Sequence, residues 1–95
     1  MIYVVYLSNE SPSRIASDLT CAGCKVWEAT SVSEVLYLCE RYKIDVVLIA
    51  ADVDEPDVIE AQMRQICMKL KPSATVKDVI WELQILFNQW DSGVQ

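Results

Sequence analysis

The feature that most constrains this chain is a regular alternation between short apolar runs and longer segments with helical periodicity. Short runs of Ile, Val, Leu and Tyr bounded by turn residues are typical of strands buried on both faces. Apolar residues spaced three and four positions apart are typical of helices that bury one face. The expected strands are residues 1–7, 25–29, 45–51 and 66–70, and the expected helices are residues 12–22, 32–43, 56–65 and 76–90. This β-α-β-α-β-α-β-α order predicts an α/β fold, a small three-layer sandwich in which helices cover both faces of a four-stranded parallel sheet.

Local signals mark where some of these helices begin and end. Ser11 followed by Pro12 is the pairing expected where Ser caps a helix and Pro occupies its first turn. Gly23 is placed to end the same helix. Ser31 with Glu34 three residues later matches a capping box, in which each side chain bonds the other residue's backbone N–H.

Length, composition and charge exclude several classes of protein. The chain has 95 residues, of which 53% are apolar, enough for the core of one small domain. We expect that domain to span residues 1–90, with a frayed tail over residues 91–95. The net charge of −6 would repel a nucleic-acid backbone. No apolar run is long enough to cross a membrane and no secretion signal is evident, so we expect a cytoplasmic protein.

The residue types needed for common catalytic and metal sites are missing. The chain contains no His, the commonest general base and a frequent metal ligand. It has no glycine-rich phosphate loop and no base to activate a serine. An acidic cluster surrounds Pro56 and comprises Asp52, Asp54, Glu55 and Asp57. The cluster lacks the glycine and distal glutamate of a calcium loop, so helix capping is its expected role. We therefore expect no enzyme, no cofactor, no metal and no catalytic residues.

Cys21 and Cys24 form a Cys-x-x-Cys pair. In a thioredoxin-like protein such a pair follows a strand and opens a helix, whose N-terminus lowers the thiol pKa. Here the pair is expected to close a helix and precede a strand. The other cysteines, Cys39 and Cys67, stand alone with no His to complete a zinc site. A structural role is the favoured interpretation, with Cys39 a core residue. The alternative is a small thiol-redox or metal-responsive protein that uses Cys21 and Cys24.

Several segments together resemble the receiver domain of two-component response regulators. Residues 23–29 resemble the family's glycine, second strand and trailing alanine. Residues 33–42 and 44–49 resemble its second helix and its phosphorylation strand, and residues 68–72 resemble the strand that closes in a Lys-Pro pair. The resemblance covers most of the chain and implies a flavodoxin-like or receiver-like sheet with the strand order 2-1-3-4.

The chemistry of a receiver does not carry over to this chain. The family accepts phosphate on an aspartate after the third strand, where this chain has Ala50. Its Mg²⁺ sits on an acidic pair after the first strand, where this chain has Ser8 and Asn9, whose neutral groups cannot replace carboxylates. Lys71 is retained, but the segment before it is short by about one β-α unit. The resemblance therefore implies a shortened, phosphorylation-incompetent relative, with Asp52 as a weaker alternative phosphoacceptor.

The last expected helix has apolar residues on two faces. Its predicted core stripe contains Val76, Val79, Ile80, Leu83, Leu86, Phe87 and Trp90. Trp81 and Ile85 point away from this stripe, one turn apart, so they would form an apolar patch in water. Asp78, Trp81 and Ile85 share the 4-3 spacing of a helix seam, which predicts an interface there. Ordinary exposed apolar residues are the alternative.

These observations together predict a bacterial-type signalling or regulatory module that acts through protein contacts. We expect it to form a homodimer through the last helix and to contact an unidentified signalling protein. Neither nucleic acid nor a membrane is an expected partner.

Overall fold

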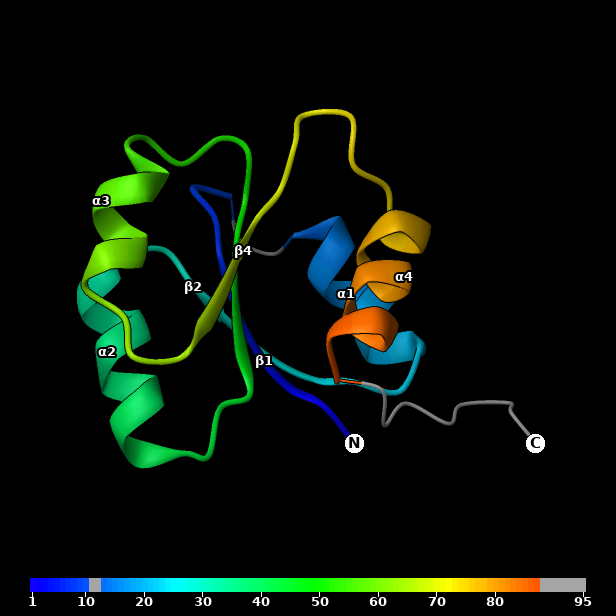
Figure 1. Cartoon of the computed structure of the whole chain (residues 1–95), viewed down its shortest axis with the longest axis horizontal. Coiled ribbons are helices and arrows are strands. Elements are labelled where there is room, and N and C mark those ends of the chain that lie inside the picture. Colours follow the sequence, from blue (N-terminus) through cyan, green and yellow to red (C-terminus); the bar gives the residue numbers. More distant parts are fainter. Residues whose placement is uncertain (11–12, 88–95) are drawn as a thin grey trace.

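The computed structural model describes residues 1–10 and 13–87. Along the chain these residues form β1 (Tyr3–Leu7), α1 (Arg14–Cys21), β2 (Lys25–Ala29), α2 (Val32–Arg41), β3 (Val46–Ile49), α3 (Pro56–Ala61), β4 (Ile66–Lys69) and α4 (Val76–Phe87). The strands form one four-stranded, all-parallel sheet in the order β2-β1-β3-β4, which confirms the predicted α/β class and strand order. Helices α2 and α3 cover one face of the sheet, and α1 and α4 cover the other (Figure 1).

Two apolar cores fill the spaces between the three layers. The core under α1 and α4 contains Ile2, Val4, Tyr6, Ala16, Leu19, Cys24, Val46, Leu48, Ala50, Val79 and Leu83. The core under α2 and α3 contains Val5, Leu7, Ala29, Val35, Ile44, Val47, Ile49 and Ile59. Successive strand residues face opposite layers, so the central strands β1 and β3 need apolar residues at nearly every position. This is why both strands are almost continuous apolar runs in the sequence.

The first helix begins later than the sequence predicts. Ser11 and Pro12 lie outside the described residues, and α1 starts at Arg14 with Ser13 as its N-cap. The Ser13 side chain makes no capping hydrogen bond. Gly23 follows the helix with a φ of 106°, a conformation that glycine adopts without strain, as predicted for the terminating residue.

Helix α2 begins as predicted but ends early. The backbone N–H of Glu34 donates to Ser31 Oγ at 3.2 Å, while the Glu34 carboxylate accepts from Thr30 N at 2.9 Å, one residue before the partner of a standard capping box. The bonds from Thr30 hold the pKa of Glu34 below its usual range. Tyr42, which lies within the expected helix over residues 32–43, is instead the C-cap and is 40% exposed. Its backbone is extended there, so helical spacing does not set its direction, and its ring stacks on Trp27.

The acidic cluster places one carboxylate, that of Asp57, in the first turn of α3 as expected, but its N-cap residue makes no capping hydrogen bond. Helix α3 has Glu55 as its N-cap, with a φ of 51° and no side-chain capping bond. A capping side chain normally acts from extended backbone, so this left-handed residue does not supply the bond. Asp57 lies in the first turn but pairs with Lys69 on β4, and Asp52 bonds the loop after β1. The helix ends at Ala61, short of the predicted boundary at residue 65.

Helix α4 opens with a capping box that involves one of the predicted interface residues. Asp78 N donates to Thr75 Oγ1 at 3.3 Å, and Thr75 N donates to Asp78 Oδ2 at 3.1 Å. The helix is described to Phe87, so Trp90 and the predicted tail over residues 91–95 lie outside the described residues. Neither α4 nor any other described helix is long and apolar enough to cross a membrane.

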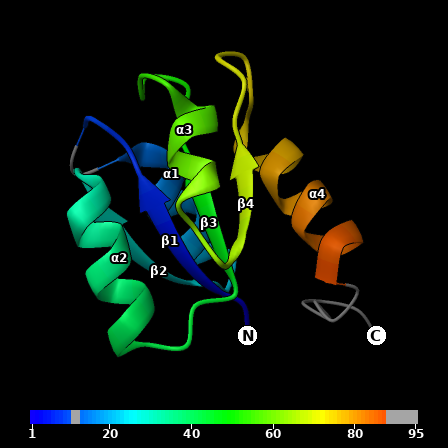
Figure 2. The same cartoon turned by 60° about the vertical axis from the view of Figure 1, so that its left-hand side comes forward.

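The core stripe of α4 is narrower than the sequence predicts. Val79 and Leu83 are buried, whereas Leu86, expected in the same stripe, is 43% exposed. The half-buried members of the stripe are Val76, Ile80 and Phe87. Figure 2 shows α4 beside β4, the edge strand of the sheet, so among the described residues no further strand extends beneath the outer margin of the helix. Ile66 at the start of β4 is also 47% exposed, for the same reason.

Candidate functional site

The carboxyl ends of parallel strands meet at one edge of a sheet, where open α/β proteins usually bind ligands. Ser8 follows β1, Ala50 follows β3 and Lys71 lies just beyond β4, and all three line a pocket of about 280 Å³. Asn9 lies beside Ser8. The fold therefore gathers the positions that the receiver resemblance singled out. Ser8 and Ala50 are buried, whereas Lys71 is exposed.

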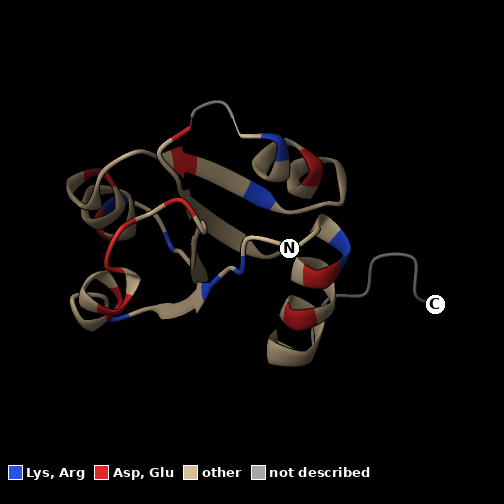
Figure 3. Cartoon of the chain, turned by 90° about the horizontal axis from the view of Figure 1, so that it is seen from above, with Lys and Arg blue, Asp and Glu red and all other residues tan. Residues whose placement is uncertain are grey.

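Asp52 reaches this edge and ties the loop after β3 to the loop after β1. Its carboxylate accepts from Ser8 Oγ at 3.4 Å and from Asn9 N at 3.3 Å. The Asn9 side-chain amide donates to the Asp52 backbone carbonyl, and Glu10 N donates to Ser8 Oγ at 2.9 Å. The hydroxyl and amide groups at the predicted site are thus used to join two loops. Figure 3, which looks down onto this end of the molecule, shows acidic residues in red along the segment from β3 to α3.

The positions that correspond to a receiver's metal and phosphate site carry no carboxylate. Ser8, Asn9 and Ala50 place a hydroxyl, an amide and a methyl group where Mg²⁺ would require oxygen ligands that include carboxylates. Across residues 1–10 and 13–87, no group of three or more His, Cys, Asp or Glu side chains is placed to hold a metal ion. The side chains at this edge can donate and accept hydrogen bonds.

Tyr6, Ser13 and Glu28 lie near the same edge and were not singled out from the sequence. Tyr6 and Ser13 line the pocket, and burial raises the pKa of the Tyr6 hydroxyl. Ser13 N donates to Glu28 Oε1 at 2.7 Å, which links the start of α1 to β2. The sequence carries only a weak signal for this contact, a carboxylate inside a short strand, because the pairing joins residues that are distant along the chain.

The cysteine pair lies where the sequence predicts, at the end of α1 and before β2. Cys21 is exposed and Cys24 is buried, so the expectation of a buried structural pair holds for Cys24 alone. Burial raises the pKa of the Cys24 thiol to about 11. Burial among apolar side chains in the core under α1 and α4 is typical of a cysteine with a packing role. Cys39 and Cys67 are half-buried in the core under α2 and α3.

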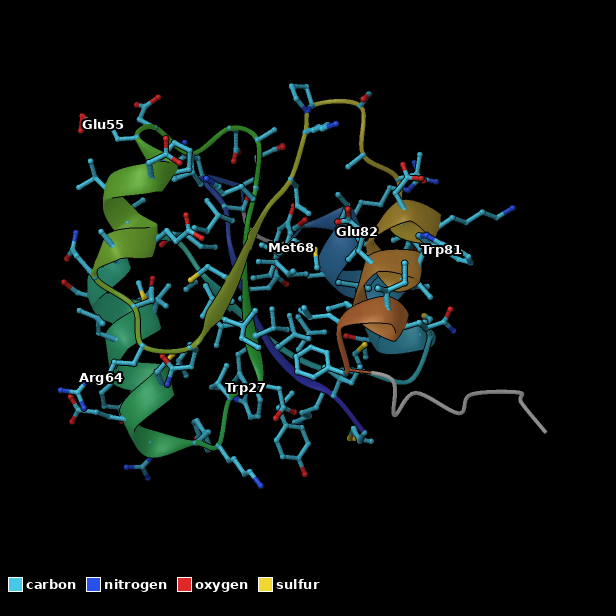
Figure 4. All side chains as sticks on the ribbon, in the orientation of Figure 1. Trp27, Glu55, Arg64, Met68, Trp81 and Glu82 are labelled. Carbon is cyan, nitrogen blue, oxygen red and sulfur yellow. The ribbon has the colours of Figure 1, made fainter. Side chains whose placement is uncertain are left out.

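The predicted interface residues lie together on the outer side of α4. Trp81 and Ile85 are each 65% exposed and one turn apart, and Figure 4 shows Trp81 directed away from the sheet. Asp78 is exposed beside them, although its carboxylate also belongs to the capping box. Leu86, adjacent to Ile85 in sequence, and Ile66 on β4 add exposed apolar surface on the same flank of the molecule.

Lys69 on the edge strand β4 forms ion pairs with two carboxylates of α3. The Lys69 ammonium contacts the Asp57 carboxylate and lies 3.2 Å from Glu60 Oε1, and these bonds raise the pKa of Lys69. The Lys69 side chain therefore pairs with two carboxylates of α3 and places charged groups beside the edge strand. Charged edges discourage pairing with a further strand, so contacts by the side chains of α4 are favoured over strand addition.

Three aromatic side chains form a cluster at the opposite edge of the sheet, where the strands begin. The Tyr3 and Trp27 rings meet edge to face with centroids 6.1 Å apart, and Tyr42 stacks on Trp27 at 4.8 Å. They line a pocket of about 290 Å³ together with Lys25 and Lys43. Sequence reasoning missed this aromatic cluster. Alternation placed Lys25 and Trp27 on one strand face, but only the sheet register brings Tyr3 beside Lys25.

Comparisons with known proteins do not assign the chain to a family. No family model matches the sequence, and neither curated proteins nor solved structures gave a match. The receiver resemblance accordingly stays a prediction from the sequence segments that carry it.

Proposed function

We propose that this chain is a non-catalytic, phosphorylation-incompetent receiver-like regulatory module that acts through protein contacts. The observation that carries the proposal is the pair of aromatic and aliphatic side chains on the outer face of α4, Trp81 and Ile85, each 65% exposed. Trp is enriched among the residues that dominate binding energy in interfaces. Exposed apolar side chains at helical seam spacing offer a defined surface for another helix.

The carboxyl edge of the sheet supports the non-catalytic part of the proposal. Ala50 has no carboxylate to accept a phosphoryl group, and Ser8 and Asn9 are joined to Asp52 by hydrogen bonds. An input by phosphorylation would need both a nucleophile and a metal pocket at this edge. The module then regulates through the partner that it binds, and α4 is the surface that contacts this partner.

The partner that fits α4 best is a second copy of the chain. A specific interface removes roughly 800 Å² from each partner, a modest part of the 6058 Å² of accessible surface of this small domain. A two-fold arrangement places the same patch against itself. If the symmetry axis runs parallel to the two helices, the Lys77 flank of one copy faces the Glu82 flank of the other. Opposite charges then border a seam made by Trp81 and Ile85.

The proposal extends to an unidentified signalling partner in the cytoplasm of a bacterial-type cell. The four cysteines are free thiols, which is usual where the compartment is reducing. The net charge of −6 disfavours a nucleic-acid partner. The thiol-redox alternative has less support, because the Cys21–Cys24 pair lies at the C-terminal end of α1, whereas a helix N-terminus is the place that lowers a thiol pKa.

Size-exclusion chromatography with light scattering tests the homodimer. Wild-type protein is expected at twice the 10.8 kDa chain mass at high micromolar concentration, and Trp81→Ser with Ile85→Ser is expected at the monomer mass. Loss of a buried Trp anchor costs about 2 kcal/mol or more, which weakens association by roughly 30-fold or more. Circular dichroism should show an intact fold in the variant.

The matched control is Tyr37→Ser with Val58→Ser, which removes two exposed apolar side chains, 59% and 54% exposed, from the helices on the other face. This control should remain dimeric. A monomeric wild type, or a Trp81→Ser/Ile85→Ser variant that still dimerises, would contradict the proposed interface.

A further inference from the structure

We infer that the aromatic cluster of Tyr3, Trp27 and Tyr42, with the cations around it, is a binding site for a small organic anion that carries one ring. The site lies at the amino edge of the sheet, on the α2 side, and is separate from the α4 surface and from the carboxyl edge. Figure 4 shows Trp27 at the lower end of the sheet, far from the loops at the top of that view.

The strand register and the end of α2 build this site. Tyr3 on β1 pairs with Lys25 on β2, and alternation places Lys25 and Trp27 on the same face of the sheet. Tyr42 and Lys43 enter from the chain that leaves α2. Side chains from three separate segments therefore converge on one pocket of about 290 Å³.

The aromatic walls are held in place before any ligand arrives. Tyr42 stacks on Trp27 with an interplanar angle of 23°, and Tyr3 meets Trp27 at 89°. Tyr3 is also fixed through its backbone, because its N–H donates to Asp45 Oδ2 at 2.9 Å and its carbonyl accepts from Asp45 N at 2.8 Å. A preorganised site loses less conformational entropy when a ligand binds, because its side chains are already ordered.

The charges around the aromatic cluster favour an anion. Lys25 Nζ lies 5.6 Å from the Trp27 ring centroid, Arg41 lies 6.0 Å from the Tyr42 ring, and Lys43 lines the pocket. In the part of the chain that the structure describes, salt bridges involve Lys69 only, so these three cations have no carboxylate partner. Arg41 lies in the last turn of α2, where a cation interacts favourably with the helix dipole, so its position has an explanation within that helix. Lys25 and Lys43 lie outside α2 and have no such explanation.

The size of the pocket sets the class of ligand. Its volume of about 290 Å³ is just below the roughly 300–1,000 Å³ range in which proteins bind drug-sized molecules, so a single ring fits better than a fused or linked ring system. The ring would lie against the aromatic walls, and a carboxylate or phosphate on it would meet the Lys25 and Lys43 ammonium groups. Aryl carboxylates and aryl phosphates share this chemistry.

Two-dimensional ¹H–¹⁵N NMR with four probes tests the site. Benzoate and phenyl phosphate are expected to cause saturable shifts at Lys25, at Tyr42 and at the Trp27 indole N–H, and their relative affinities tell which anionic group is preferred. Neutral benzyl alcohol and ringless inorganic phosphate should each bind at least tenfold more weakly, because each lacks one of the two recognised features.

Exposed lysines supply variants that should keep the fold. Lys25→Gln with Lys43→Gln should weaken benzoate and phenyl phosphate binding at least tenfold. The control Arg64→Gln with Lys71→Gln removes the same charge at two exposed positions outside this pocket and should leave binding unchanged. The inference is overturned if no probe gives saturable shifts by about 10 mM, if benzyl alcohol binds as well as benzoate, or if both charge variants weaken binding equally.

Discussion

Replacing Leu83 with Ala tests how α4 is seated on the sheet, and Leu86→Ala is its matched control. Both positions carry the same side chain on the same helix, but Leu83 is fully buried whereas Leu86 is 43% exposed. Truncating a buried Leu costs about 2–5 kcal/mol, because the apolar contacts are lost and a cavity remains. Truncating a half-exposed Leu should cost at most about 1.5 kcal/mol, because part of its surface already contacts water.

The difference is large against the stability of so small a domain. At about 0.05–0.15 kcal/mol per residue, a domain of this length has a free energy of unfolding of roughly 5–14 kcal/mol. A loss of about 3 kcal/mol at Leu83 should lower Tm by roughly 12–24 °C, whereas Leu86→Ala should lower it by at most about half of that. Urea unfolding followed by circular dichroism measures the free energy of unfolding of each variant, and thermal unfolding measures its Tm. Both are done at a protein concentration low enough to avoid association. If Leu86→Ala lowers the free energy of unfolding as much as Leu83→Ala or more, α4 buries a different face. The outward placement of Trp81 and Ile85 would then be wrong.

Two further predictions concern chemistry at the sheet edge and at the thiols. Acetyl phosphate with Mg²⁺ should leave the protein mass unchanged, because Ala50 offers no carboxylate and Asp52 is bonded to Ser8 and Asn9; a stable phosphoryl adduct on Asp52 would refute this. In the folded protein at pH 8, Cys21 should react first with a chromogenic disulfide reagent, because it is exposed. Cys24 and Cys67, with pKa values raised to about 11, should lag and then speed up as the pH rises toward that value. At pH 8 such thiols are ionised to only about one part in a thousand, so four equal rates in native protein would contradict the burial.

The fold class follows from local features of the sequence. Apolar runs such as Val46–Ile49, and helical stripes such as the one that contains Val35, depend on residues a few positions apart. Alternation of the two patterns restricts the chain to a parallel sheet between helix layers. Gly23 and the Ser31–Glu34 pair likewise act within one turn of chain, so the ends they mark were predictable.

The parts of the candidate sites that could not be predicted depend on contacts between distant residues. The spacing within α4 gave the outward direction of Trp81 and Ile85, but it also placed Leu86 in the core. The exposure of Leu86 depends on where the sheet stops, at β4. Helical spacing alone carries no information about how far a neighbouring layer extends.

The sequence by itself determined which segments become strands and helices and which face of most helices is apolar, since these properties arise from residues within one or two turns of each other. Only the tertiary structure decided that Asp52 bonds Ser8 and Asn9 and that Tyr3, Trp27 and Tyr42 share one pocket. Those contacts depend on strand register and on the path of the loops. Strand register and loop path both depend on the free energy of packing the whole domain, and no single segment of the sequence determines that free energy.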